Sequence, residues 1–305
     1  MNQRHYLINY TATTKIQHSS DETMETTKLF RKNKIVDNDG KIIDKYNVSA
    51  NAMRNRLRVA AATQLLELLN LNKQELPALA HIVLFSGGPR INKTSAESKK
   101  GNIAEGCTPI AYSNKICELF PFLELLGTTT AFSFVPVGES RLRVGELTAI
   151  TKSILNCGDY KNIYKGTEPP DICVEFQFNV KLDNKETNVN TFANMFDVQY
   201  IIEGTRFVQS ITLLCDESKS NLLDSCFQNI FQYWQISMCG YVGGKVSNDC
   251  GRIKCTDITT EFDDLDTYKQ YVLNNSQKII DALMNENTWK DIDAVIKKEK
   301  ANAKT

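Results

Sequence analysis

A run of capping, basic and apolar residues over 49–71 constrains the fold more than any other part of the chain. Ser49 and Asn51 are residue types that cap helix N-termini. The apolar residues that follow recur at helical spacing, and they are Met53, Leu57, Ala61, Leu65 and Leu68. The spacing predicts a helix over 50–71 with one buried face.

A second face of the same helix is polar and basic. Asn51, Arg54 and Arg58 stand at i, i+3 and i+7. Cations at a helix start oppose its dipole, whereas a phosphate docked on the first N–H groups beside them would reverse that penalty. Two interpretations therefore stay open, an anion-binding helix start and a solvated basic surface.

Composition indicates an ordinary globular protein. The 305 residues are 42% hydrophobic and 24% charged, and no apolar run is long enough to span a bilayer. The start of the chain has no apolar stretch of the kind that export signals carry, and the nine cysteines lack a C-x-x-C pair. We expect reduced thiols in a cytoplasmic protein, with no metal site and no cofactor.

Charge is unevenly distributed along the chain. Residues 1–165 hold 22 Lys+Arg against 15 Asp+Glu, a balance of +7, and residues 166–305 hold 14 against 21, a balance of −7. Such a division can steer a polyanion to one face or let identical copies attract head to tail. It can equally arise by chance on a neutral protein.

The first part of the chain contains a basic hairpin. Asp39-Gly40 separates two β-rich runs, a strong hairpin signal, and the ribbon carries Lys28, Arg31, Lys32 and Lys34. We expect further extended segments at His5–Ala12, Ala80–Ser86, Leu142–Leu155, Tyr200–Cys215 and Gly251–Ile258.

The remaining segments predict two more helices and two insertions. Helices are expected over Asn221–Ile236 and 276–300, the latter running into a charged tail that ends at 305. Polar sequence at 87–115 indicates a long loop or insertion. The 156–198 segment, with Pro169-Pro170 and the alternating run ICVEFQFNVKL, indicates a hairpin that projects from the body.

Without its insertions the chain has the order β-α-β-β-α-β, the split βαβ arrangement of ferredoxin-like and RRM folds. We therefore predict an α+β fold, one RRM-like domain over 1–305. RRM sheets bind single strands through paired aromatic motifs, which this chain lacks, so the fold alone does not predict RNA binding.

The segment SANAMRNRLR resembles the S-G-N-x-x-R-x-x-x-R segment of CRISPR-associated backbone subunits in the RAMP superfamily, most closely those of type IV effector complexes. Further similarities follow in matching order at FSGG (85–88), PFLELLG (121–127), EGTRF (203–207) and GYVGGK (240–245). The chain departs from the pattern at Ala50, which replaces the usual glycine, and in a Gly-rich loop whose one basic residue is Lys245.

The resemblance implies a non-catalytic subunit that oligomerises along a guide RNA into a helical assembly. Its partners would be the guide, a complementary target nucleic acid and other effector subunits, with no membrane. A palm with the RRM-like fold would hold the guide, and the 156–198 insertion would be its thumb. The RNA-binding candidates are Lys28, Arg31, Ser49, Asn51, Arg54, Arg58, Gly243, Gly244 and Lys245.

Three catalytic alternatives receive weaker support. The run GGPRINKT over 87–94 nearly fits a phosphate-binding loop, but Asn92 replaces its second glycine. Asp21 and Glu22 lie in a polar segment that we expect to be a loop, where related type III subunits place a target-cutting aspartate. His5, His18 and His81 show no partner pattern for acid–base chemistry. A RAMP-type endoribonuclease, processing guide precursors or cutting target RNA, is therefore the alternative function.

Overall fold

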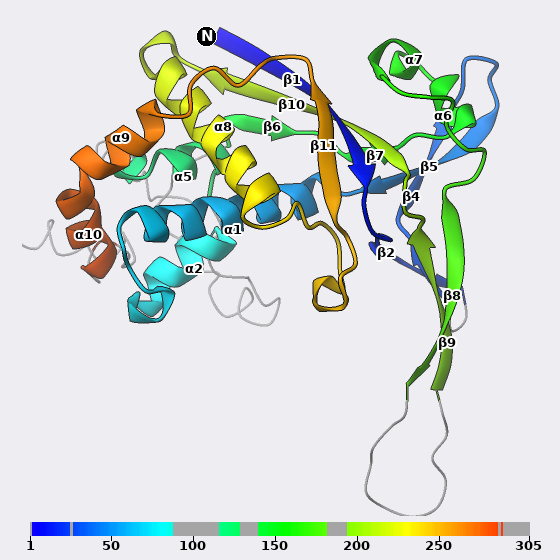
Figure 1. Cartoon of the computed structure of the whole chain (residues 1–305), viewed down its shortest axis with the longest axis horizontal. Helices are drawn as coiled ribbons and strands as arrows, with labels where there is room; N and C mark the ends of the chain where they lie inside the picture. The colour runs from blue at the N-terminus through cyan, green and yellow to red at the C-terminus, as the bar shows by residue number, and fades with distance from the viewer. Residues whose placement is uncertain are drawn as a thin grey trace, which may run out of the picture.

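The computed structural model describes residues 2–24, 27–87, 116–128, 140–181, 194–285 and 288, and its main feature is an antiparallel sheet. The sheet's strand order is β11 (Ile253–Ile258), β1 (Asn2–Ala12), β10 (Arg206–Cys215), β7 (Leu147–Ala149), β5 (Ile42–Val48) and β4 (Lys32–Val36), and β6 (Leu142–Val144) also pairs with β10. Figure 1 shows helices α1 (Ala50–Leu68) and α8 (Ser220–Ile236) side by side against this sheet.

Chain order and spatial order together reproduce the expected plan. The chain passes through β1, α1, β7, β10, α8 and β11, and β1 lies between β10 and β11 in the sheet. This is the β-α-β-β-α-β order, so the α+β prediction is confirmed. The Asp39-Gly40 hairpin between β4 and β5 is also confirmed, with Gly40 at φ +82°.

The main core lies between the sheet and its helices. Tyr6, Ile8 and Tyr10 alternate along β1 with no exposed surface, as one buried face of a strand requires. The Tyr6 ring packs 4.8 Å from that of Phe227 on α8. From α1, Met53, Leu57, Ala61 and Leu65 are buried in the same core, as their spacing predicted.

The opposite face of the sheet is partly covered by the start of the 156–198 insertion. Within the insertion, helix α7 (Tyr160–Ile163) packs Tyr160 and Ile163 against a small cluster that contains Val208 of β10 and Ile154 of the preceding helix α6 (Lys152–Leu155). The prediction that this whole insertion projects is therefore wrong for its first part, because the side chains of α7 complete a second small core.

The projecting hairpin itself consists of β8 (Val174–Lys181) and β9 (Asn194–Ile201), and it extends away from the body in Figure 1. It belongs to a second sheet with the order β2 (Ser19–Met24), β3 (Thr27–Phe30), β9 and β8. The predicted hairpin is confirmed over these strands, and residues 182–193 lie outside the described residues.

The predicted strand at Ala80–Ser86 is wrong, because this segment forms helix α2 (Ala78–Ser86). Pro77 is its N-cap residue, and Gly87 ends it in the left-handed conformation at φ +75°. A short apolar run fits a buried strand and a buried helix equally well, and here the flanking proline and glycine were the better signal.

Two long extended runs are interrupted. Leu142–Leu155 contains β6 and β7 and then turns into α6, where the Thr151 hydroxyl accepts from the Ile154 N–H at 3.4 Å. Tyr200–Cys215 contains the end of β9 and all of β10, separated by a turn with Gly204 at φ +83°. Because of that turn, the two strands belong to different sheets.

Shorter elements complete the body. They are η1 (Lys73–Glu75), α5 (Pro121–Leu126), η3 (Glu217–Lys219), η4 (Val246–Asn248), α9 (Thr267–Asn274) and α10 (Ser276–Met284). Of the predicted 276–300 helix, 276–284 is confirmed, and the tail over 289–305 lies outside the described residues. The predicted insertion at 87–115 lies outside them from residue 88 onward, as does most of the GGPRINKT run.

Candidate nucleic-acid interface

Helix α1 begins as the sequence predicted. Ser49 is extended at φ −62° and ψ 147°, and its hydroxyl accepts from the Ala52 N–H at 3.2 Å. The first N–H groups of a helix have no acceptor within it, so the serine satisfies one of them. Asn51 is exposed beside this turn. The start of α1 is therefore a place where a phosphate oxygen could accept hydrogen bonds.

His18 and Arg31 support this helix start, and the sequence alone did not reveal the role of His18. Nε2 of His18 accepts from the Ser49 N–H at 3.2 Å, and its carbonyl accepts from the Arg31 N–H at 2.8 Å. The Arg31 side chain donates to Asn47 at 3.1 Å and lies 3.9 Å from Glu146. Arg31 thus has a carboxylate partner, which makes it a weaker phosphate ligand than its position in the sequence predicted.

The His18 contact predicts a pH effect on stability. Burial and the charge of Arg31 lower the pKa of His18 from its ordinary value of 6.5. The unfolded chain therefore takes up the proton first as the pH falls. The free energy of unfolding should decrease below pH 6.5 and level off below the folded-state pKa.

Urea unfolding across this pH range tests the assignment. In His18→Gln, the side-chain amide oxygen can still accept from Ser49 but does not titrate, so this part of the pH dependence should disappear. Equal pH dependence in the variant and the parent would contradict a neutral, accepting His18.

Arg54 lies half-buried on α1, next to Arg143 of β6. Burial and then the positive charge of Arg143 lower the pKa of Arg54. Nη2 of Arg54 is 3.5 Å from the Leu142 carbonyl, and its Nε is buried without a hydrogen-bond partner. Among the described residues, no carboxylate lies within ion-pair distance of Arg54. Arg143 is exposed, and its place in the sequence did not mark it as a candidate.

Arg58 is buried, which its spacing on the helix did not indicate, and its RNA-binding role stays a prediction. Its exposed fraction is 6%, and Nη2 donates to the carbonyls of Leu126 at 3.0 Å and Gly127 at 2.6 Å. Burial and the charge of Arg54 lower its pKa to about 10. The guanidinium also packs on Gly87, where an added Cβ would lie 3.0 Å from its Cζ. Arg58 thus joins the C-terminal ends of α2 and α5, whose dipoles favour a cation.

The Gly-rich loop at 240–245 is attached to α1 by an arginine that the sequence motifs did not indicate. Nη2 of Arg56 donates to the Gly243 carbonyl at 2.8 Å. Gly243 has φ +69°, and a Cβ there would lie 2.2 Å from the Gln17 carbonyl oxygen. The close backbone approach that Gly243 permits is therefore to Gln17 of the same chain. Gly244 is exposed, and a Cβ there would make only ordinary contacts, the nearest with Oε1 of Gln17 at 3.7 Å. Lys245 donates to the Tyr200 hydroxyl at 2.9 Å.

The other candidates lie at the second sheet. Lys28 is exposed on β3. Asp21 and Glu22 belong to strand β2, which corrects the prediction of a loop, and their side chains lie outside the described residues. The three histidines all have structural contacts. His5 bonds Thr212 at 2.9 Å, His18 accepts from Ser49, and His81 stacks on Phe85 with centroids 4.8 Å apart.

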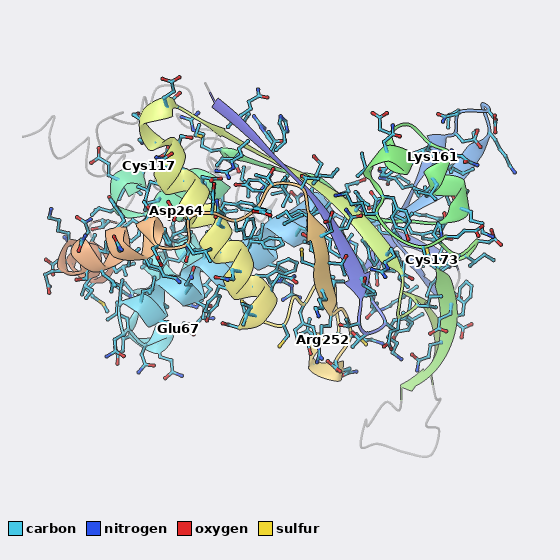
Figure 2. The ribbon with its side chains drawn as sticks, turned by 45° about the horizontal axis from the view of Figure 1, so that its top comes forward. Glu67, Cys117, Lys161, Cys173, Arg252 and Asp264 are labelled. Atoms are coloured by element: carbon cyan, nitrogen blue, oxygen red, sulfur yellow. The ribbon has the colours of Figure 1, made fainter. Side chains whose placement is uncertain are left out.

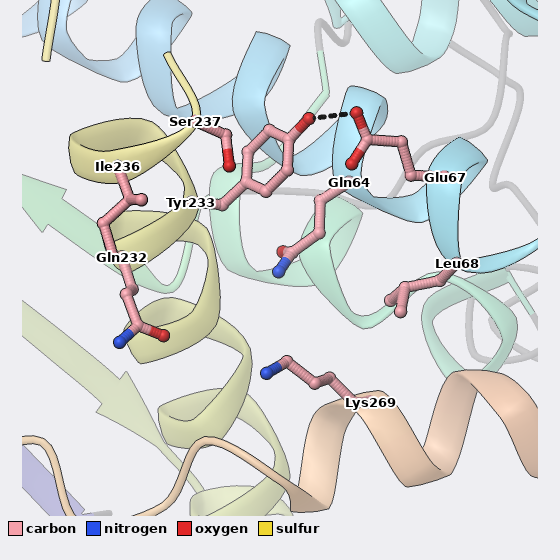
Figure 3. Close-up of a pocket in the computed structure, with 8 residues that line it drawn as sticks. All are labelled: Gln64, Glu67, Leu68, Gln232, Tyr233, Ile236, Ser237 and Lys269. Atoms are coloured by element: carbon pink, nitrogen blue, oxygen red, sulfur yellow. Dashed lines mark hydrogen bonds between the residues drawn. The ribbon is translucent and has the colours of Figure 1, made fainter. Parts of the chain in front are cut away.

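A pocket of about 320 Å³ lies elsewhere, among α1, α8 and α9 (Figure 3). The Tyr233 hydroxyl donates to Glu67 at its edge at 2.5 Å, and burial and this carboxylate raise the pKa of Tyr233. The pocket lining includes Lys269 but none of the RNA-binding candidates. The RNA-binding candidates therefore lie outside this pocket.

Comparison with known proteins supports the fold. No model of a known protein family matches the chain, and no curated protein matches it. One solved structure that does match is described as a Type IV-B CRISPR complex. A chain of that complex aligns with a TM-score of 0.53 and 16% identity, covering 88% of this chain and 98% of its own. This chain shares the fold of that type IV-B CRISPR chain.

The match to the type IV-B chain confirms at the level of fold the resemblance that the sequence motifs indicated. In the part of the chain that the structure describes, no helix is both long and apolar enough to cross a membrane.

Proposed function

We propose that this chain is a subunit of a type IV-like CRISPR effector complex and binds the sugar-phosphate backbone of its guide RNA at the start of α1. Arg54 carries the proposal. It is a half-buried cation with an unpartnered Nε and, among the described residues, no carboxylate partner.

A phosphate at this place would supply what Arg54 lacks. It would accept from the guanidinium, from the first N–H groups of α1 and from the nearby Arg143 of β6. Phosphate contacts carry no sequence information, so such a site suits a subunit that must hold guides of any sequence.

The proposal also includes assembly, which the shared fold with the type IV-B chain supports. Copies of the chain assemble along the guide, with the β8–β9 hairpin of one copy reaching its neighbour, beside other effector subunits and a complementary target strand. The subunit is non-catalytic in this proposal, and the contacts of His5, His18 and His81 are consistent with structural roles.

Fluorescence anisotropy with labelled oligouridine and oligoadenosine tests the site. Arg54→Gln and Arg143→Gln should each weaken both complexes about equally. Each should also lower the slope of log K against log salt by about 0.7 for every phosphate that is no longer neutralised. Arg141→Gln is the matched control, because the charge of Arg141 is compensated by Glu124 at 3.7 Å. Unchanged affinity in the Arg54 variant at every salt concentration would contradict the proposal.

A further inference from the structure

The β8–β9 hairpin meets the Gly-rich loop through a short strap of chain after β1. In this strap Ile16 bridges to Ile201 at the hairpin root, and Gln17 bridges to Gly244. The Lys15 carbonyl also accepts from the Gly251 N–H at 2.8 Å. Three segments that are distant in sequence therefore meet at one junction. Arg252, labelled in Figure 2, immediately precedes β11 at the end of the body nearest the hairpin.

Tyr200 is the centre of this junction. It is 2% exposed and packs with Val198 and Cys250. Nζ of Lys15 lies 5.0 Å and Nζ of Lys245 lies 5.5 Å from the centroid of its ring. Lys245 also donates to the Tyr200 hydroxyl at 2.9 Å, and Lys15 to Gln177 of β8. The two ammonium groups thus contact both strands of the hairpin.

In the part of the chain that the structure describes, the two lysines lack an anionic partner. Among the described residues, no carboxylate lies within ion-pair distance of Lys15 or Lys245. Glu175 is opposite Tyr200 in the strand register, yet no ion pair joins it to either lysine. Two cations on one ring repel each other, and an aromatic face compensates only part of an ammonium charge.

Backbone conformation gives an independent sign that Lys245 is held in place. Its φ of 53° and ψ of 34° lie in the left-handed region, which is unfavourable for a residue with a side chain. Asn or Gly would suit that conformation better. Strain of this kind persists where the surroundings enforce it, and it is often found at functional sites.

We infer that Lys15 and Lys245 form a second phosphodiester-binding site at the hairpin root, separate from the one at Arg54. A bound phosphate supplies the missing anion and contacts Lys15 and Lys245, which belong to the two segments that hold Tyr200. RNA binding therefore stabilises the direction in which the hairpin leaves the body. Arg56 links the two sites, since it extends from α1 to Gly243. That the natural ligand is guide RNA rests on the proposed function.

Anisotropy with labelled oligouridine tests the site through the variant Lys15→Gln with Lys245→Gln. Affinity should fall about tenfold, and the salt slope should fall by about 0.7 for each phosphate that the variant no longer neutralises. Lys161→Gln is the matched control, because Lys161 is exposed on α7, well apart from Arg252 (Figure 2). Lys15→Arg with Lys245→Arg keeps both charges and should restore most of the affinity if the glutamine variant also loses structure.

Hydrogen exchange provides a second measurement. Oligouridine should slow exchange of the β8 and β9 amides in the parent but not in the glutamine variant. Parental affinity and parental protection in that variant would overturn the second site, while a loss of affinity in Arg54→Gln would still support the proposed function. Absence of oligouridine binding by the parent would overturn both.

Discussion

Replacing Arg58 with alanine is expected to lower the free energy of unfolding by about 2–3 kcal/mol. Each hydrogen bond from a charged group contributes about 1.5–3 kcal/mol. Part of the lost stability is regained, because the variant no longer has to bury a charge. The variant leaves the carbonyls of Leu126 and Gly127 without their donor and leaves a cavity beside Gly87. Urea unfolding followed by circular dichroism measures the change.

Arg56→Ala is the matched control for this prediction. Arg56 is half-buried and donates to one carbonyl, that of Gly243. Because water can partly replace a hydrogen bond at a half-buried position, its removal should cost about 1 kcal/mol, clearly less than the loss of the two buried hydrogen bonds of Arg58. A fully stable Arg58→Ala variant with weakened RNA binding would contradict the structural role and restore the interpretation of Arg58 as a surface ligand.

Shortening the β8–β9 hairpin should abolish assembly without unfolding the body. Replacing 178–197 with a short Gly/Ser turn keeps the buried root, Cys173, Val198 and Tyr200, but removes the part that projects. Exposed Ile172 and Phe176 show that the remaining hairpin already has apolar surface facing solvent. We expect a parental melting temperature, and RNA-bound particles no larger than single copies by light scattering.

The β4–β5 hairpin offers a discriminating comparison. Val36 and Ile42 are paired near its tip, and their exposed fractions are 63% and 65%. Val36→Ser with Ile42→Ser should leave assembly intact. The opposite result would be long particles from the shortened β8–β9 variant and no long particles from the serine variant. That result would place the contact between copies at the β4–β5 hairpin.

Local signals in the sequence predicted the elements that bear the site. The capping residue and apolar spacing of α1, the Asp39-Gly40 turn and the alternating strands of the projecting hairpin act over a few residues, so they can be recognised without tertiary context. Ser49, Asn51 and Arg54 lie where their spacing predicted them.

Tertiary context explains the failures. Arg54 and Arg58 have equivalent helical positions, and only the packing of α2 and α5 around Arg58 decides that it is buried. The roles of His18, Lys15 and Arg143 depend on segments that are far apart in the chain. No spacing within the sequence could indicate those contacts.

The two oppositely charged halves of the sequence do not form two halves of the body. In the sheet, β1 of the basic half lies between β10 and β11 of the acidic half. Head-to-tail attraction between whole halves is therefore a poor basis for assembly. Local sites such as the start of α1 and the hairpin root remain as the surfaces on which RNA and neighbouring copies would act.

The most direct test of RNA-guided assembly is to purify the chain from cells that make guide RNA and to map the RNA that survives nuclease digestion. We expect co-purified RNA with regularly spaced protected nucleotides, on particles larger than one chain, and no cutting of complementary RNA when Mg²⁺ is added. A nucleic-acid-free monomer would contradict RNA-guided assembly, and Mg²⁺-dependent cutting that Asp21→Ala abolishes would contradict a non-catalytic subunit.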